Sequence, residues 1–189
     1  MRKVYFVASI RGKSQFLENY KSIVGALRAG GLEVIENILK PTEKEVYALT
    51  DGGKIEYYKR VLKWISQADI VVAEASFSSL GVGYEISLAL EKNKPVIVLY
   101  EEGQAPHFLG GIQSDRLSLV KYTLVKLPSI LKQAFEHSSA QMETRFNFFV
   151  PRRLVVYLDW ISKNKRIPRA VYLRQLIRRE MQRNRDFQS

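Results

Sequence analysis

The sequence predicts an α/β fold in which helices cover both faces of a five-stranded parallel sheet, followed by a small C-terminal module. In the first 135 residues, short apolar runs rich in β-forming residues alternate with segments whose apolar residues recur at helical spacing. Strands that alternate with helices in this way form parallel sheets. After residue 136 the pattern changes to one alternating strand and two amphipathic helices.

Five segments have the composition of strands in such a sheet. They are residues 3–8, 32–35, 69–73, 95–100 and 118–125. Strands covered on both faces are apolar throughout rather than alternating, as these mostly are. Helices are expected between them, at residues 16–27, 55–65, 82–93 and 128–135. The right-handed crossover rule then favours the doubly wound, flavodoxin-like (Rossmann-like) strand order.

Length and charge predict a larger α/β domain followed by a smaller and more basic one. The 189 residues fit an α/β domain at 1–136, a polar linker at 137–143 and a small domain at 144–189. Of the net charge of +11, residues 1–135 carry +4 and residues 136–189 carry +7. A basic C-terminal quarter is typical either of a solvated helix surface or of a module that binds a polyanion.

Composition excludes several kinds of chemistry. The chain has no cysteine, so it has no disulfide, thiol nucleophile or thiolate metal site. Its two histidines, His107 and His137, lie far apart without carboxylates at metal-ligand spacing, and we expect neither a metal nor a cofactor. The apolar runs are too short to span a membrane, and the N-terminus has no cleavage site of a signal peptide, so a cytoplasmic protein is expected.

Ligands of such sheets bind beyond the carboxyl ends of the strands, which draws attention to two loops. After the first strand come Ser9, Ile10, Arg11 and Gly12, which offer a hydroxyl, a guanidinium and a glycine amide to an anion. The alternative is an ordinary turn with a surface arginine.

The loop after the third strand contains Gly81 and Gly83, which allow a ligand to approach the backbone closely. It leads to Glu85, which we expect in the first turn of the next helix. The alternative is that this acidic residue only complements the helix dipole.

Together these segments resemble the nucleoside 2-deoxyribosyltransferase superfamily, and within it the 2′-deoxynucleoside 5′-phosphate N-hydrolases, over roughly residues 3–130. The resemblance is carried by Tyr-Phe at 5–6, Ser-Ile-Arg-Gly at 9–12, the segment 64–74, Ser-Leu-Gly-Val-Gly-Tyr-Glu at 79–85 and Lys-Pro at 94–95. It implies a nucleoside 5′-monophosphate as ligand, with no metal. It also implies catalytic roles for Glu85, as nucleophile at the anomeric carbon, and for Tyr5. Phosphate binding is implied for Ser79 and for the loop from Ser9 to Gly12.

Two positions depart from the pattern of that family. A second catalytic Asp of the family corresponds to Val61 here. A phosphate-binding Ser supplied by the neighbouring subunit corresponds to Leu109, with Ser114 and Ser118 as nearby alternatives. Turnover is therefore left open by the sequence.

The C-terminal segment resembles a ribbon-helix-helix domain of the Arc/MetJ type over residues 144–184. Residues 144–150 alternate like a strand, Pro151 ends it, and two amphipathic helices follow, the second after Pro168. About 40 residues cannot bury enough apolar surface alone, so we expect a homodimer or a higher even-numbered oligomer. The resemblance implies that Arg145, Asn147 and Phe149 face DNA bases and that Arg169 lies at a phosphate. The alternative is a dimerisation module that never touches DNA.

Three functional hypotheses follow. The first is a nucleotide N-glycosidase on a double-stranded-DNA-binding dimer. The second is a transcriptional regulator that senses a nucleotide without cleaving it. The third is a metabolic N-glycosidase that uses its C-terminal segment only to dimerise.

Overall fold

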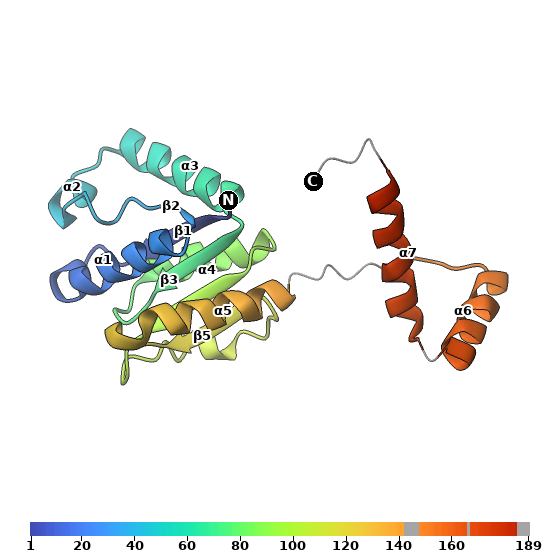
Figure 1. The fold of residues 1–189 in the computed structure, drawn as a ribbon. Coiled ribbons are helices and arrows are strands. Elements are labelled where there is room, and N and C mark those ends of the chain that lie inside the picture. Colours follow the sequence, from blue (N-terminus) through green and yellow to red (C-terminus); the bar gives the residue numbers. More distant parts are fainter. Residues whose placement is uncertain (142–147, 166, 185–189) are drawn as a thin grey trace. The chain divides into compact units, whose positions relative to one another are not determined.

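The computed structural model describes residues 1–141, 148–165 and 167–184. The chain divides into two compact units, Met1–Thr144 and Arg145–Ser189, which are treated separately below (Figure 1).

The first unit is built on the predicted sheet. Five parallel strands lie in the order β2-β1-β3-β4-β5, which is the flavodoxin-like order. Their bounds are β1 Lys3–Ala8, β2 Glu33–Ile35, β3 Ile70–Glu74, β4 Val96–Tyr100 and β5 Leu117–Lys121. The prediction of an α/β fold with a five-stranded parallel sheet is therefore confirmed.

Helices cover both faces of the sheet, so that the side chains of each strand alternate between two apolar clusters. Even-numbered residues of β1 and β3 pack against α1 (Lys13–Ala29) and α5 (Leu127–Gln141), which Figure 1 shows on the same side of the sheet. Odd-numbered residues of these strands pack against α3 (Asp51–Gln67) and α4 (Leu80–Glu91). The central strands are buried on both sides, which explains their apolar composition.

Two helices differ from the prediction. The short helix α2 (Glu43–Tyr47) was not predicted, although Thr42 and Glu45 form a capping box at its start. Helix α3 begins at Asp51 rather than at residue 55, because the Thr50 hydroxyl caps the amide of Gly53.

Helix α5 also extends further than predicted, through Gln141 instead of ending at residue 135, and thus includes most of the expected linker. Ser138 is buried on this extension, at helical spacing from Leu131 and Ala134. Because Ser138 is polar, the spacing of apolar residues did not predict that the helix continues past residue 135. Conversely, β5 ends at Lys121, and residues 124–126 form a 3-10 turn where strand was expected.

The second unit is helical. It contains α6 (Arg152–Lys165) and α7 (Arg169–Arg183), joined by contacts that include the Tyr157 and Tyr172 hydroxyls at 3.2 Å. The expected strand is wrong for residues 148–150, which have no strand conformation, and its remainder at 144–147 lies outside the described residues. A ribbon of this type hydrogen-bonds only to its copy in a dimer, so a single chain supplies no partner strand. Within the described part of the chain, no helix is long and apolar enough to cross a membrane.

Two isoleucines of α3 test how far packing against the sheet holds the first unit together. Ile65 is 0% exposed and Ile55 is 56% exposed. We expect Ile65→Ala to lower the free energy of unfolding by about 2–5 kcal/mol, because it leaves a cavity in the core. Ile55→Ala is the matched control, with an expected change within about 0.5 kcal/mol. Urea denaturation measures both, and equal losses would contradict this packing.

Candidate active site

The candidate site lies at the carboxyl edge of the sheet, where the loops after β1 and β3 are neighbours. The strands pair in parallel with Ala8 opposite Glu74, so both loops start at the same level. The first runs through residues 9–12 to α1, and the second through residues 75–79 to α4. The two loops that the sequence singled out are thus adjacent.

Tyr5 of β1 and Glu85 of α4 are in direct contact. The Tyr5 hydroxyl donates a 2.7 Å hydrogen bond to Oε2 of Glu85. Tyr5 is completely buried on β1, and its ring lies 5.8 Å from that of Trp64 on α3. Glu85 lies in the second turn of α4, not in the first as expected, because the helix starts at Leu80. A role limited to the helix dipole is therefore less favoured than the sequence suggested.

Burial dominates the acid–base behaviour of this pair. It raises the pKa of Glu85 to about 7, and the hydrogen bond from Tyr5 partly opposes the rise. Burial, and then the charge of Glu85, also raise the pKa of Tyr5 well above its ordinary value. Near neutral pH, Glu85 is therefore divided between its acid and its carboxylate, while Tyr5 stays a hydrogen-bond donor.

The loop after β1 is held tightly by its neighbours. The buried Ser9 hydroxyl accepts a hydrogen bond from the Gly12 amide at 3.3 Å, and the Ser9 carbonyl accepts one from the Tyr20 hydroxyl at 3.2 Å. A Cβ atom at Gly12 would lie 2.6 Å from both Phe77 and the Tyr20 hydroxyl, so glycine is required there by packing. Ile10 is half-buried, whereas Arg11 is exposed and lies 3.9 Å from Glu43.

The loop after β3 lines a cavity. Ser79 is the N-cap of α4 and accepts from the Val82 amide at 3.5 Å. A cavity of about 760 Å³ extends from Ser79, Gly83 and Tyr84 to the segment 103–109 after β4. Added Cβ atoms would meet nothing within 4 Å at Gly83 and only the Ser79 hydroxyl, at 3.8 Å, at Gly81, so packing within the chain requires neither glycine.

Aromatic residues of α3 and α4 complete the site, and the sequence analysis did not single them out. The Tyr57 ring meets Trp64 edge-on at 6.4 Å. Further out, the Tyr58 and Tyr84 rings stack at 6.4 Å, with hydroxyls 3.4 Å apart. The signal that could have found them is the aromatic content of α3, but apolar residues at helical spacing are typical of any core.

Val61 and Leu109, the two positions that depart from the pattern of the family, are both buried. Val61 packs in the same cluster as Tyr5, and Leu109 lies in a 3-10 turn at the wall of the cavity. Ser114 caps its own loop by accepting from the Arg116 amide at 3.2 Å. In the described ranges, no group of three or more metal-ligating side chains could hold a metal ion.

The residues assigned to DNA lie in the second unit. Arg145 and Asn147 fall outside the described residues. Phe149 is fully exposed, and Arg169, the first residue of α7, forms an ion pair with Asp159 of α6. The structure therefore tests none of the proposed base contacts.

The chain is similar in sequence to known proteins over about 70% of its length. The mouse 5-hydroxymethyl-dUMP N-hydrolase is 33% identical over 141 residues, which cover 70% of this chain and 79% of that protein. A Syntrophotalea carbinolica protein, named as a candidate 2′-deoxynucleoside 5′-phosphate N-hydrolase, is 34% identical over 135 residues, which cover 69% of this chain and 92% of the relative. The chain belongs to the 2′-deoxynucleoside 5′-phosphate N-hydrolase family.

A solved structure agrees at the level of the fold. The CMP N-glycosidase from Clostridium botulinum superposes with a TM-score of 0.52 at 19% identity, over 70% of this chain and 99% of that chain. No protein-family model matches the chain.

The Tyr5–Glu85 hydrogen bond makes a prediction about acidity. We expect Tyr5→Phe to raise the pKa of Glu85 above about 7, because the lost hydrogen bond is the interaction that opposes burial. The pKa can be followed by NMR titration of selectively labelled glutamate. Tyr58→Phe, which removes a hydroxyl of the outer aromatic pair, is the control and should leave the Glu85 titration in place.

Proposed function

We propose that the first unit hydrolyses the N-glycosidic bond of 2′-deoxynucleoside 5′-monophosphates. The observation that carries the proposal is the hydrogen bond between Tyr5 of β1 and Glu85 of α4. Both relatives named above carry N-hydrolase names, and a partly exposed carboxylate is the group that such chemistry needs.

Each side chain has a distinct part in this proposal. The Glu85 carboxylate attacks the anomeric carbon, and Tyr5 holds Oε2 so that the other oxygen faces the sugar. The loop from Ser9 through Ile10, Arg11 and Gly12 binds the 5′-phosphate together with Ser79. Gly81 and Gly83 leave room for the ligand beside the backbone.

Arg11 is available for that phosphate. Its ion pair with Glu43 is long, at 3.9 Å, and both side chains are exposed, so it contributes little stability. A phosphate can therefore attract the guanidinium at small cost, and remote binding of this kind positions the sugar over Glu85.

The second hypothesis, nucleotide sensing without turnover, is favoured by one observation. Val61 is buried in an apolar cluster and offers no second carboxylate. Binding and base release must therefore be measured separately to distinguish an enzyme from a sensor.

Release of free base from deoxynucleoside monophosphates is the direct test. We expect Glu85→Gln to abolish base release while nucleotide binding, measured by calorimetry, persists. Glu91→Gln, at the exposed end of the same helix, is the matched control and should retain activity. Because only ionised Glu85 is nucleophilic and its pKa is raised to about 7, the rate should rise with pH through about 7 and then level off. Nucleotide binding without base release at any pH would favour the sensor.

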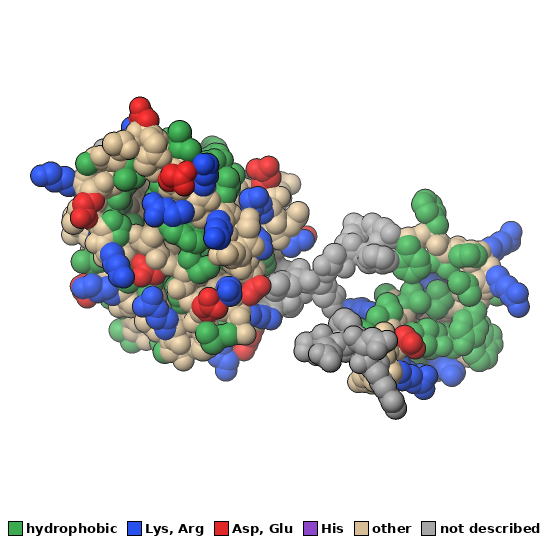
Figure 2. Space-filling model, turned by 90° about the horizontal axis from the view of Figure 1, so that it is seen from above, with side chains coloured by type: hydrophobic (Ala, Val, Ile, Leu, Met, Phe, Trp, Pro, Cys, Tyr) green, Lys and Arg blue, Asp and Glu red, His purple; other side chains and the backbone are tan. Residues whose placement is uncertain are grey.

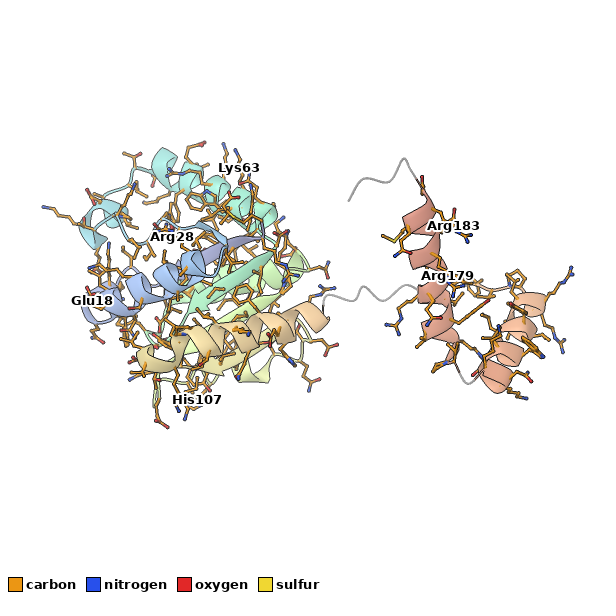
Figure 3. The ribbon with its side chains drawn as sticks, in the orientation of Figure 1. Glu18, Arg28, Lys63, His107, Arg179 and Arg183 are labelled. Carbon is orange, nitrogen blue, oxygen red and sulfur yellow. The ribbon has the colours of Figure 1, made fainter. Side chains whose placement is uncertain are left out.

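We also propose that the second unit pairs with a second copy and binds double-stranded DNA. Apolar side chains gather on one face of this unit (Figure 2). The large apolar residues exposed on α6 and α7 are Leu154, Val156, Tyr157, Trp160, Leu176, Ile177 and Met181. So many exposed apolar residues on two helices need a covering surface. Arg179 and Arg183 project from α7 (Figure 3) and contribute to the basic excess that suits a polyanion. In this proposal Arg145, Asn147 and Phe149, which precede α6, face the bases, and Arg169 lies near the backbone.

Ile177 allows the pairing to be tested. It is 60% exposed on α7, and Ile55 in the first unit is 56% exposed. We expect Ile177→Arg to shift the sedimentation equilibrium of the full chain toward smaller species and to weaken duplex binding, because a charge cannot be buried at the proposed interface. Ile55→Arg adds the same charge elsewhere and should do neither. Duplex binding should also weaken steeply with salt. A chain that binds no duplex at low salt would rule out the DNA proposal.

A further inference from the structure

We propose that the surface of α3 facing Glu85 restricts hydrolysis to nucleotides whose base can leave as a stabilised anion, and that Val61 determines this specificity. The inference rests on the proposed N-hydrolase function and names the substrate class of that same site.

The face of α3 toward the site is apolar and aromatic. Tyr57, Val61 and Trp64 are spaced by four and three residues, so they lie on one side of the helix. Trp64 contacts both Tyr57 and Tyr5, and Val61 is 3% exposed in the same cluster as Tyr5. Lys63 points outward on another face of α3 (Figure 3). None of the three inward residues can donate a proton readily near neutral pH.

Glu85 therefore acts as a single carboxylate. Across the described ranges, its hydrogen bond is with Tyr5, and no ion pair joins it to a cation. Other acids near the strand ends have partners of their own: Glu36 pairs with Arg28 of α1 at 3.6 Å, Glu74 accepts from Tyr122 at 3.2 Å, and Glu43 lies 3.9 Å from Arg11. Tyr5 is a poor proton source, since burial raises its pKa further above neutrality.

One carboxylate cannot supply a nucleophile and a proton in the same step, a task that glycosidases divide between two. As Glu85 bonds to C1′, the C1′–N bond breaks and its electron pair goes to the base, which departs unprotonated. Water then attacks C1′ and releases the Glu85 carboxylate. One hydrogen of the water stays in the new hydroxyl, and the other becomes the proton of the free base. The barrier of the first step thus depends on how well the base bears negative charge.

Pyrimidine bases of similar shape differ in how well they bear negative charge. The uracil anion shares its charge between two carbonyls, fluorine at C5 withdraws more of it, and a methyl group donates. In cytosine an amino group replaces one carbonyl, so its anion is the least stabilised. Among pyrimidines, the acceptable bases are therefore 2,4-dioxopyrimidines, especially those with electron-withdrawing groups at C5.

Single-turnover rates of base release, with the full chain in excess, test the inference. We expect them to fall in the order 5-fluoro-dUMP, dUMP, dTMP, dCMP, with a difference on the order of tenfold between the first two. Fluorine and hydrogen are similar in size, so this first step reports electronic demand rather than fit.

Val61→Asp and Val61→Asn form a matched pair. A buried aspartic acid has a raised pKa and can protonate the departing base, so Val61→Asp should narrow the ratio of the 5-fluoro-dUMP rate to the dCMP rate by tenfold or more. Val61→Asn has nearly the same shape without the acid and should keep the steep order. Rates of the unaltered chain that are independent of the base would overturn the inference and leave the N-hydrolase function standing. No base release from any of the four nucleotides would overturn the proposed function itself, and the inference with it.

Discussion

Burial of the sheet on both faces makes polar groups on its central strands depend on partners within the protein. Tyr5 shows the consequence, since its side chain is completely enclosed and its hydroxyl needs an acceptor. Glu85 is that acceptor, at 2.7 Å, and an unsatisfied hydroxyl there would cost about 1–3 kcal/mol. The same contact orients the carboxylate of Glu85, a residue that is only partly exposed. The raised pKa of Glu85 therefore follows from its burial in the fold and needs no bound substrate.

On the opposite face of the sheet the same problem is solved only in part. Oε1 of Glu74, the last residue of β3, accepts from the Ser76 amide and the Tyr122 hydroxyl, each at 3.2 Å. Oε2 of Glu74 is buried with no hydrogen-bond partner among the described residues. Asn19 of α1 donates to Tyr122 and to Glu101, each at 2.7 Å. Burial raises the pKa of Glu74 as it does that of Glu85. Glu74 is completely buried, however, whereas Glu85 is partly exposed, so a raised pKa alone does not distinguish a structural carboxylate from a reactive one.

The sequence was informative where one physical rule decided the outcome. Continuous apolar runs predicted the buried strands, and the carboxyl-edge rule for parallel sheets predicted that the loops after β1 and β3 are adjacent. It was less informative where partners come from distant segments. The Tyr5–Glu85 bond joins residues 80 positions apart, and the aromatic face of α3 has the spacing of an ordinary core helix. Helix α2 was missed although its capping box is visible in the sequence, because five residues are too few for a periodic pattern.

The second unit shows a different limit of reasoning from one chain. Its two helices were predicted from apolar spacing, but the strand predicted before them is wrong for residues 148–150. Alternating side chains suggest a strand, yet they do not show that a partner strand is present to pair with it. Arg169 presents a related conflict, because it is paired with Asp159 inside the unit. For Arg169 to reach a phosphate, its guanidinium must leave this carboxylate or share itself between the two anions. A basic residue at the start of a helix is therefore not a free cation merely because of its position. In the proposed DNA-binding function, the basic residues further along α7, including Arg179 and Arg183, would carry more of the electrostatic attraction than Arg169.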